Sequence, residues 1–159
     1  MSLLYKSLRV GRYGKPFWIF KIRTLTEAGT GYAEKENYTR YGKLLRTLKI
    51  DELPQLLNVL RGQMALVGPR PEEQSTIDAI PEDVRETILS VKPGLTSPAS
   101  IYFSDEEKLL QEAHDPSRLY WTAIKPMKMF LDVWYVKNKS VLLDLAILWG
   151  TLRKLITKK

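Results

Sequence analysis

Apolar and polar residues alternate with a period of two at the start of the chain, whereas most of the remainder follows a helical period. Aromatic and β-branched residues gather in Leu4 to Val10 and in Pro16 to Leu25. The glycine-containing run Gly11-Arg12-Tyr13-Gly14-Lys15 separates these two segments. Two strand-like segments around such a turn predict an N-terminal β-hairpin.

The second predicted strand carries two basic residues near its end. Lys21 and Arg23 alternate with Phe20 and Ile22, so one face of the strand is apolar and the other is basic. For two such residues taken alone, a solvated outer face is a better interpretation than a ligand site.

Helical periodicity and helix-start signals follow the hairpin. The predicted helices are Tyr41 to Ile50, Leu53 to Arg61, Pro81 to Leu89, Asp105 to Ala113, Pro116 to Val136 and Ser140 to Ile156. Pro126 should kink or break the fifth of these, because proline cannot donate a helical hydrogen bond. These elements predict an α+β, predominantly helical fold with the hairpin packed on several helices, as a single domain over residues 1–159.

The segments between the predicted helices have distinct characters. Leu66 to Pro71 is expected to be extended, and Lys92 to Pro98 to form a rigid loop. Thr26 to Asn37 reads as a polar loop that could close over a substrate. In the first predicted helix, three leucines share one face and are expected to lie in the core: Leu44, Leu45 and Leu48.

The last predicted helix is apolar on more than one face and ends in Arg153, Lys154, Lys158 and Lys159. Such a helix is either buried or lies in a membrane interface, with its tryptophan near the headgroups and its lysines at lipid phosphates. No run approaches the roughly twenty consecutive apolar residues that a membrane span requires.

Composition narrows the class of binding partner and the kinds of covalent and metal site. The 159 residues include 25 Lys and Arg against 18 Asp and Glu, a formal net charge of +7 that favours anionic partners. There is no cysteine, which excludes disulfides and cysteine-based zinc sites. The single histidine, His114, is expected to be a surface or capping residue.

The adjacent carboxylates of Asp51 and Glu52 stand where the second predicted helix begins. Asp51 at a helix start would accept backbone N–H groups, and the helix dipole would lower its pKa. An acid pair before an apolar run is also an ordinary capping signal, so capping and an active site both remain open. Arg46 and Arg70 could bring two guanidinium groups to one anion beside the acids, and arginine suits bidentate phosphate binding.

Several ordered motifs together resemble the bacterial sugar transferases, the monotopic phosphoglycosyl transferases. They are Lys21-Ile22-Arg23-Thr24, Leu45-Arg46, Asp51-Glu52-Leu53-Pro54-Gln55-Leu56-Leu57-Asn58-Val59-Leu60, Leu66-Val67-Gly68-Pro69-Arg70-Pro71, Lys92-Pro93-Gly94-Leu95-Thr96 and Trp134-Tyr135-Val136-Lys137-Asn138. The likeness runs from about Leu8 to the C-terminus.

The resemblance implies transfer of a sugar-1-phosphate from a UDP-sugar to polyprenyl (undecaprenyl) phosphate, with release of UMP, at the start of polysaccharide or glycoconjugate synthesis. By that analogy Asp51 is the nucleophile that forms an aspartyl-phosphosugar intermediate. Glu52, with Asp51, would hold Mg²⁺. The expected substrate-binding residues are Arg46, Arg70, Lys21, Arg23, Pro69 and Pro71, with Arg70 first because its flanking prolines limit its freedom.

The same resemblance implies work at the cytoplasmic face of the bacterial inner membrane. Family members usually carry an apolar re-entrant helix before the hairpin. Here Leu4 already adjoins the hairpin, so we expect this form to lack that helix and to be peripheral.

Two other classes fit parts of the pattern. A nucleic-acid-binding module would explain the charge, but the basic residues are dispersed and show no RNA- or DNA-binding motif, so no nucleic-acid partner is expected. A non-catalytic membrane-surface domain would explain the last helix if the acids merely capped.

Overall fold

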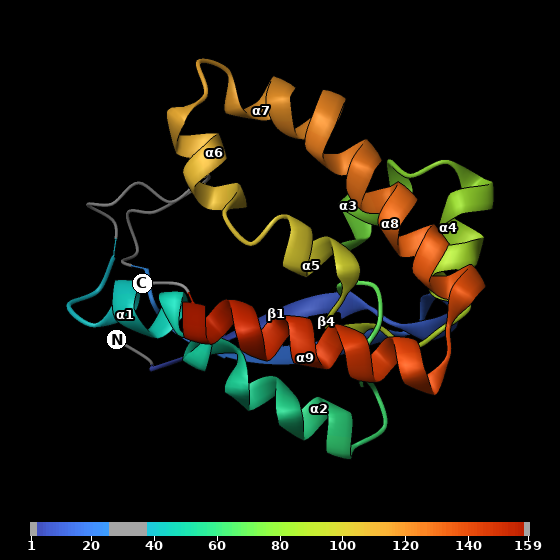
Figure 1. Ribbon diagram of the computed structural model, residues 1–159, viewed down its shortest axis with the longest axis horizontal. Helices are drawn as coiled ribbons and strands as arrows, with labels where there is room; N and C mark the ends of the chain where they lie inside the picture. Colours follow the sequence, from blue (N-terminus) through green and yellow to red (C-terminus); the bar gives the residue numbers. More distant parts are fainter. Residues whose placement is uncertain (1–2, 26–37, 158–159) are drawn as a thin grey trace.

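The computed structural model describes residues 3–25 and 38–157. Within them, nine α-helices accompany an N-terminal hairpin and a second sheet of two short parallel strands (Figure 1). The predicted α+β, mainly helical fold is therefore confirmed. The predicted lid over Thr26 to Asn37 lies outside the described residues.

The hairpin consists of β1 (Leu4–Val10) and β2 (Pro16–Ile22), paired antiparallel with Leu8 opposite Trp18. Its inner face buries Phe17 and Ile19 against Met64. The hairpin was predicted correctly, but the orientation of its basic face was wrong. Lys21 shares the inner face, because side chains two residues apart on a strand point the same way.

A parallel pair of strands holds the middle of the chain. It joins β3 (Ala65–Val67) to β4 (Gly94–Thr96). A Cβ added at Gly94 would lie 2.0 Å from the backbone nitrogen of Gly68, so only glycine allows this approach. The expectation of a rigid loop over Lys92 to Pro98 was therefore wrong in part, since a strand pairing with a distant segment leaves no local periodic signal.

The helices occupy most of the remaining chain. Their bounds are α1 (Gly42–Thr47), α2 (Leu56–Leu60), α3 (Gln74–Asp78), α4 (Glu82–Leu89), α5 (Pro98–Tyr102), α6 (Glu106–Glu112), α7 (Pro116–Leu119), α8 (Lys125–Asn138) and α9 (Val141–Thr157), with a 3₁₀ helix η3 (Ile50–Gln55) before α2. The short α3 and α5 were not predicted. A π-helical turn, η4 (Tyr120–Ile124), interrupts the helix ahead of Pro126, as that proline predicted.

The C-terminal helix α9 packs against the parallel strands through Ile147, which forms a buried cluster with Val67 and Tyr135. The Tyr135 hydroxyl donates to Asp144 at 2.6 Å and lies 3.1 Å from the carbonyl oxygen of Val67. This bond explains how a fully buried phenol on α8 is satisfied. It joins α8, α9 and β3 at one point.

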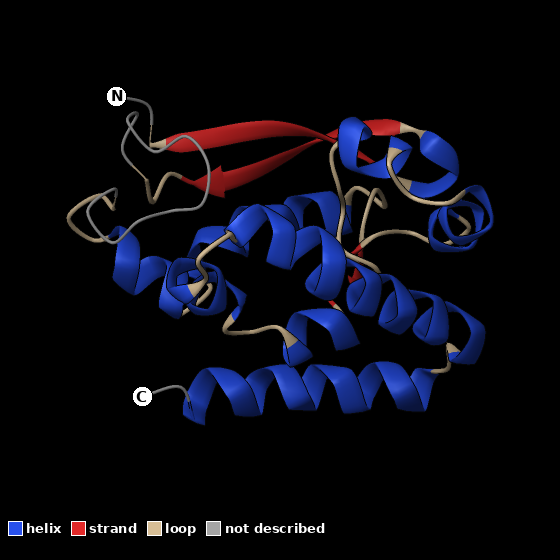
Figure 2. Ribbon diagram, turned by 90° about the horizontal axis from the view of Figure 1, so that it is seen from above, coloured by secondary structure: helices blue, strands red, loops and turns tan. Residues whose placement is uncertain are grey.

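Apolar residues also cover the outside of the molecule. The face of α9 that points away from the core exposes Leu142, Leu145, Trp149, Leu152 and Ile156. Figure 2 shows α9 and the hairpin on opposite sides of the other helices. Over residues 3–25 and 38–157, no helix has the length and hydrophobicity needed to cross a bilayer.

The predicted core position of the first leucine group is wrong. Leu44 is 59 % and Leu48 is 43 % exposed, and Leu45 is only partly buried. The next segment continues this surface with four more exposed leucines: Leu53, Leu56, Leu57 and Leu60. Helical spacing identified an apolar face but could not show that the face looks outward.

Candidate active site

The acid pair lies in η3, which packs beneath strand β2. Asp51 is 7 % and Glu52 is 8 % exposed. Lys49, the residue before η3, has φ of 57°, in the left-handed region that non-glycine residues rarely adopt. This turn directs the chain into η3, where both acids become buried.

Asp51 does not cap a helix, so that prediction was wrong. It lies inside η3, one residue past the start, and no side-chain cap bond forms there. Its Oδ1 atom is buried and has no hydrogen-bond partner among the described residues. Because a buried acceptor without a partner is costly, such atoms are rare and often mark a functional site.

Glu52 is held by two cations from different parts of the chain. Arg70, just after β3, donates through Nη2 to Glu52 Oε1 in a close ion pair, and Lys21 Nζ lies 3.4 Å from the same oxygen. Burial would raise the pKa of Glu52, but the charges of Arg70 and Lys21 outweigh it and hold that pKa well below its usual range. Glu52 is therefore firmly ionised.

The neighbouring carboxylate has the opposite environment. Burial, and then repulsion by Glu52, raise the pKa of Asp51, while Lys21 and Lys49 oppose the rise. The expectation of a lowered pKa was wrong because burial and the charge of Glu52 outweigh the neighbouring cations. The two adjacent carboxylates thus differ: Glu52 is ion-paired, whereas Oδ1 of Asp51 has no hydrogen-bond partner in residues 3–25 and 38–157.

Lys21 is the cation of this group whose own pKa falls. Burial and the nearby charge of Arg70 lower the pKa of Lys21 to about 8, although Glu52 acts in the other direction. An anionic ligand arriving between these cations would relieve their mutual repulsion. The site therefore favours a phosphate-like group electrostatically.

The backbone around Arg70 is fixed by its neighbours. Pro69 and Pro71 are both buried, and the carbonyl oxygen of Pro69 accepts a hydrogen bond of 2.8 Å from the backbone nitrogen of Gly94. The two prolines thus hold the position of Arg70, and contact with substrate through them stays a prediction.

The two other predicted cations lie apart from Glu52. Arg46 pairs with Glu107 of α6, Nε to Oε2 at 3.1 Å, and the Tyr38 hydroxyl donates to the same carboxylate. The charge of Arg46 still acts on Asp51. Arg23 lies over the ring of Tyr5, 5.8 Å from its centroid. Roles for Arg46 and Arg23 in substrate binding stay predictions.

A divalent ion is compatible with this donor set. No group of three or more His, Asp or Glu side chains capable of metal binding occurs in the part of the chain that the structure describes. Mg²⁺, however, usually takes only one or two carboxylates and completes its shell with water and substrate phosphates. Glu52 and Asp51, whose Oδ1 has no hydrogen-bond partner in the described part of the chain, fit that limited role.

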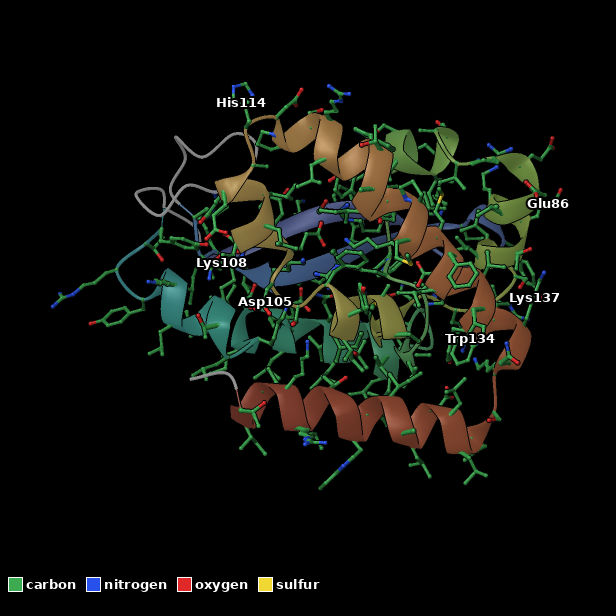
Figure 3. All side chains as sticks on the ribbon, turned by 45° about the horizontal axis from the view of Figure 1, so that its top comes forward. Glu86, Asp105, Lys108, His114, Trp134 and Lys137 are labelled. Atoms are coloured by element: carbon green, nitrogen blue, oxygen red, sulfur yellow. The ribbon has the colours of Figure 1, made fainter. Side chains whose placement is uncertain are left out.

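Sequence reasoning missed several residues around the acids. Lys49 acts electrostatically on both of them. Its only signal in the sequence is its place two residues before Asp51. Glu107 and Tyr38, which engage Arg46, come from distant segments and gave no signal. His114 is exposed, as predicted, and Figure 3 shows it at the outer end of the connection between α6 and α7.

A family model described as "Bacterial sugar transferase" matches residues 1–158. The chain belongs to the bacterial sugar transferase family. This confirms the resemblance found in its motifs, and it makes the protein a transferase. The family assignment rests on nearly the whole chain rather than on the acid pair alone.

Individual sugar transferases show the same relationship. An uncharacterized sugar transferase of Bacillus subtilis is 38 % identical over 99 % of this chain and 71 % of its own length. The UDP-glucose:undecaprenyl-phosphate glucose-1-phosphate transferase of Caulobacter vibrioides is 35 % identical, over 97 % of this chain and 57 % of its own. A UDP-N-acetylgalactosamine-undecaprenyl-phosphate N-acetylgalactosaminephosphotransferase of Aeromonas hydrophila is 32 % identical, over 98 % of this chain and 36 % of its own length. The chain thus spans only part of these relatives.

Proposed function

We propose that this protein transfers a sugar-1-phosphate from a UDP-sugar to undecaprenyl phosphate and releases UMP, as a first step in polysaccharide or glycoconjugate assembly. The names of the Caulobacter and Aeromonas relatives describe such transfers to undecaprenyl phosphate. The observation that carries the proposal is the buried Oδ1 of Asp51, which has no hydrogen-bond partner among the described residues, beside a Glu52 that two cations already neutralise.

In the proposed first half-reaction, a carboxylate oxygen of Asp51 attacks the phosphorus nearest the sugar. The new O–P bond forms as the diphosphate bridge breaks, and UMP leaves with the bridging oxygen and its electron pair. In the second half-reaction, an oxygen of the lipid phosphate attacks the same phosphorus, and the Asp51 carboxylate is released. No net proton is required.

The residues around Asp51 have separate tasks in this reaction. Arg70, with its planar fork of donors, binds the diphosphate, and Lys21 adds a second positive charge. Glu52 holds both cations in place before substrate arrives. Mg²⁺, held by Glu52 and Asp51, would supply charge neutralisation for the phosphates and the departing UMP.

We also propose that the outer face of α9 rests on the cytoplasmic surface of the inner membrane. Five exposed apolar residues form its stripe: Leu142, Leu145, Trp149, Leu152 and Ile156. A helix with a long apolar stripe and a tryptophan is suited to lie in the plane of a membrane interface. Lys154 does not reach for headgroups, because it donates to the carbonyl of Ile101 and to the hydroxyl of Ser104.

The chemistry can be tested by intact-mass analysis of the full chain with Mg²⁺ and a panel of UDP-sugars. We expect an adduct of one sugar-phosphate that disappears when undecaprenyl phosphate in detergent is added, with stoichiometric UMP. Asp51→Asn should abolish the adduct. The exposed Asp78 provides the matched control, and Asp78→Asn should leave the adduct unchanged.

Two outcomes would count against this function. An adduct that persists in Asp51→Asn would reject that nucleophile. UMP release that depends on lipid phosphate but passes through no adduct, even in rapid-quench samples, would reject the covalent route. The non-catalytic alternative required the acids to act as caps, and Asp51 makes no cap bond. The non-catalytic alternative predicts membrane binding without UMP release from any UDP-sugar.

A further inference from the structure

Helix α6 is attached to two different parts of the molecule through adjacent acids. Glu107 pairs with Arg46 of α1, Oε2 to Nε at 3.1 Å, and Glu106 pairs with Lys128 of α8, Oε2 to Nζ at 2.5 Å. Figure 1 shows α1 and α6 at the same end of the molecule. The mechanism proposed above gives neither acid a role. The two ion pairs nevertheless connect α8 to the segment that carries the acid site.

Backbone hydrogen bonds join Arg46 to the acid site. Its carbonyl oxygen accepts from the backbone nitrogen of Lys49 at 3.1 Å, and the carbonyl oxygen of Lys49 accepts from the backbone nitrogen of Glu52 at 3.3 Å. These bonds close the left-handed turn through which α1 leads into η3. Burial raises the pKa of Asp51, and the charge of Arg46 opposes that rise. A phosphate bound at Asp51 would therefore lie within the field of Arg46.

The ion pair between Arg46 and Glu107 is accessible to a solute. The side chain of Arg46 is 36 % exposed and that of Glu107 is 32 % exposed. Pairs as exposed as this contribute little to stability, because water screens their attraction. A diphosphate carries more negative charge than one carboxylate and can accept two parallel N–H bonds from a guanidinium. Exchange of Glu107 for a diphosphate at Arg46 is therefore favourable.

A second hydrogen bond holds Glu107 on its other oxygen. The Tyr38 hydroxyl donates to Oε1, whereas Arg46 pairs with Oε2. Burial, and then the hydrogen bond to Glu107, raise the pKa of Tyr38 to about 12, so this hydroxyl keeps its proton at physiological pH. Glu107 would keep this partner after losing Arg46. The bond to Tyr38 thus lowers the cost of releasing the arginine.

We infer that Glu107 occupies Arg46 in the ligand-free protein in place of a substrate phosphate, and that the diphosphate of a bound nucleotide displaces it. Glu107 is then a competitor of the substrate and not one of its ligands. On displacement, α6 loses its link to α1 and stays attached to α8 through Glu106 and Lys128. The inference rests on the proposed function, which takes a nucleoside diphosphate sugar as donor.

The competition can be measured by isothermal titration calorimetry of the full chain with Mg²⁺ and UDP, which lacks the sugar and is not turned over. Glu107→Gln should tighten UDP binding by about two- to fivefold, the strength of an exposed ion pair. A residue that merely positioned Arg46 would have the opposite effect. Arg46→Gln should weaken binding by about tenfold. In the Arg46→Gln background, Glu107→Gln should change nothing further.

The matched control is Glu112→Gln, which removes the same charge from the same helix. Glu112 is exposed, and its partner is Lys108 of α6 at 3.9 Å. This variant should bind UDP like the unmodified chain, which separates competition at Arg46 from a general change in net charge. A second measurement keeps Glu107 in place. The ¹⁵N-detected Nε–Hε signal of Arg46, assigned by its loss in Arg46→Lys, should shift when UDP is added.

Several results would overturn the inference. They are weaker or unchanged UDP binding in Glu107→Gln, an equal gain in Glu112→Gln or in the Arg46→Gln background, and an Arg46 signal that UDP does not move. The proposed reaction is judged separately by the sugar-phosphate adduct. Tighter UDP binding in Glu107→Gln without any adduct would reject the reaction and leave the competition intact. An adduct with unchanged UDP affinity would do the reverse.

Discussion

The acid site and the outer face of α9 both reverse the usual distribution of residues, in which charged side chains lie at the surface and apolar ones in the interior. Around Glu52, charged side chains from β2 and from the loop after β3 turn inward and pair. On α9, leucines and Trp149 turn outward. Soluble domains seldom bury charge or expose contiguous apolar surface without a functional reason. This distribution is what the proposed function would require, with a charged donor bound inside and lipid in contact with the outside.

The largest effect expected in the acid site is that of Asp51→Asn. It should slow the first half-reaction by about a thousandfold or more, since it removes the nucleophile. The raised pKa of Asp51 means that ionisation costs stability as pH rises from the unfolded value through the folded one. Above that range, urea unfolding should therefore show Asp51→Asn to be more stable, by about 1 kcal/mol. Equal or lower stability would contradict the strained state of this carboxylate.

Arg70→Met should damage both the fold and the chemistry. It leaves Glu52 buried with only the more distant Lys21, and breaking such a pair costs about 3 kcal/mol. Loss of a phosphate-binding fork should reduce the rate by about a hundredfold. Arg70→Lys keeps the charge and should recover part of the stability but little of the rate. Full activity in either variant would remove Arg70 from the site.

The apolar outer face of α9 can be tested with the double variant Leu145→Ser and Trp149→Ser. Loss of two side chains that insert only in part, worth about 2 kcal/mol together, should weaken binding to vesicles with 30 % anionic lipid by roughly thirtyfold. The free energy of unfolding should hardly change, because both residues are exposed. Trp18, 47 % exposed on the hairpin at the opposite side, is the control. If Trp18→Ser weakens sedimentation with vesicles as much, the membrane face has been misassigned.

The pH dependence of adduct formation sharpens the contrast between the two acids. Only ionised Asp51 can attack, and its pKa is raised, so the rate should still rise above the ordinary carboxyl range of about 4, by up to about tenfold per pH unit. Rapid-quench measurements from pH 4.5 to 8 would follow this limb. A rate that is already level at pH 5 would contradict it.

The smallest expected effect concerns how α9 is attached. The Ser140 side chain accepts a hydrogen bond from the backbone nitrogen of Leu143 at 3.2 Å. Ser140→Ala should therefore cost about 1 kcal/mol in urea unfolding, as for other helix caps. Adduct formation should be unaffected, since the proposed reaction gives Ser140 no role. A loss of the adduct would show that α9 helps to shape the acid site.

Local sequence patterns predicted a substantial part of this fold. The hairpin, α4, α6, α9 and the break before Pro126 follow from alternation, helix-start residues and the missing proline N–H. The pairing of β3 with β4 could not be predicted in this way. Three-residue strands carry too little periodicity, and their contact depends on Gly68 and Gly94 meeting across the fold.

The candidate site was predicted by residue type more successfully than by environment. Arg70 and Lys21 were selected as cations and do meet at Glu52. The predicted cap at Asp51, its lowered pKa and the solvated face of Lys21 were wrong. Each depended on which way a short element faces, which is set by the left-handed turn at Lys49 and by packing beneath the hairpin.

By itself, the sequence determined the family, the mainly helical architecture and the residue types available for phosphate chemistry. These follow from ordered motifs and from local backbone preferences, which are written in neighbouring residues. Only the tertiary structure decided that Glu52 is paired while, within the described part of the chain, an oxygen of Asp51 has no partner. It also decided that leucines of α1 and the stripe of α9 face outward. Burial and Coulomb interactions depend on distance in space, and distance in space is not a property of any local segment.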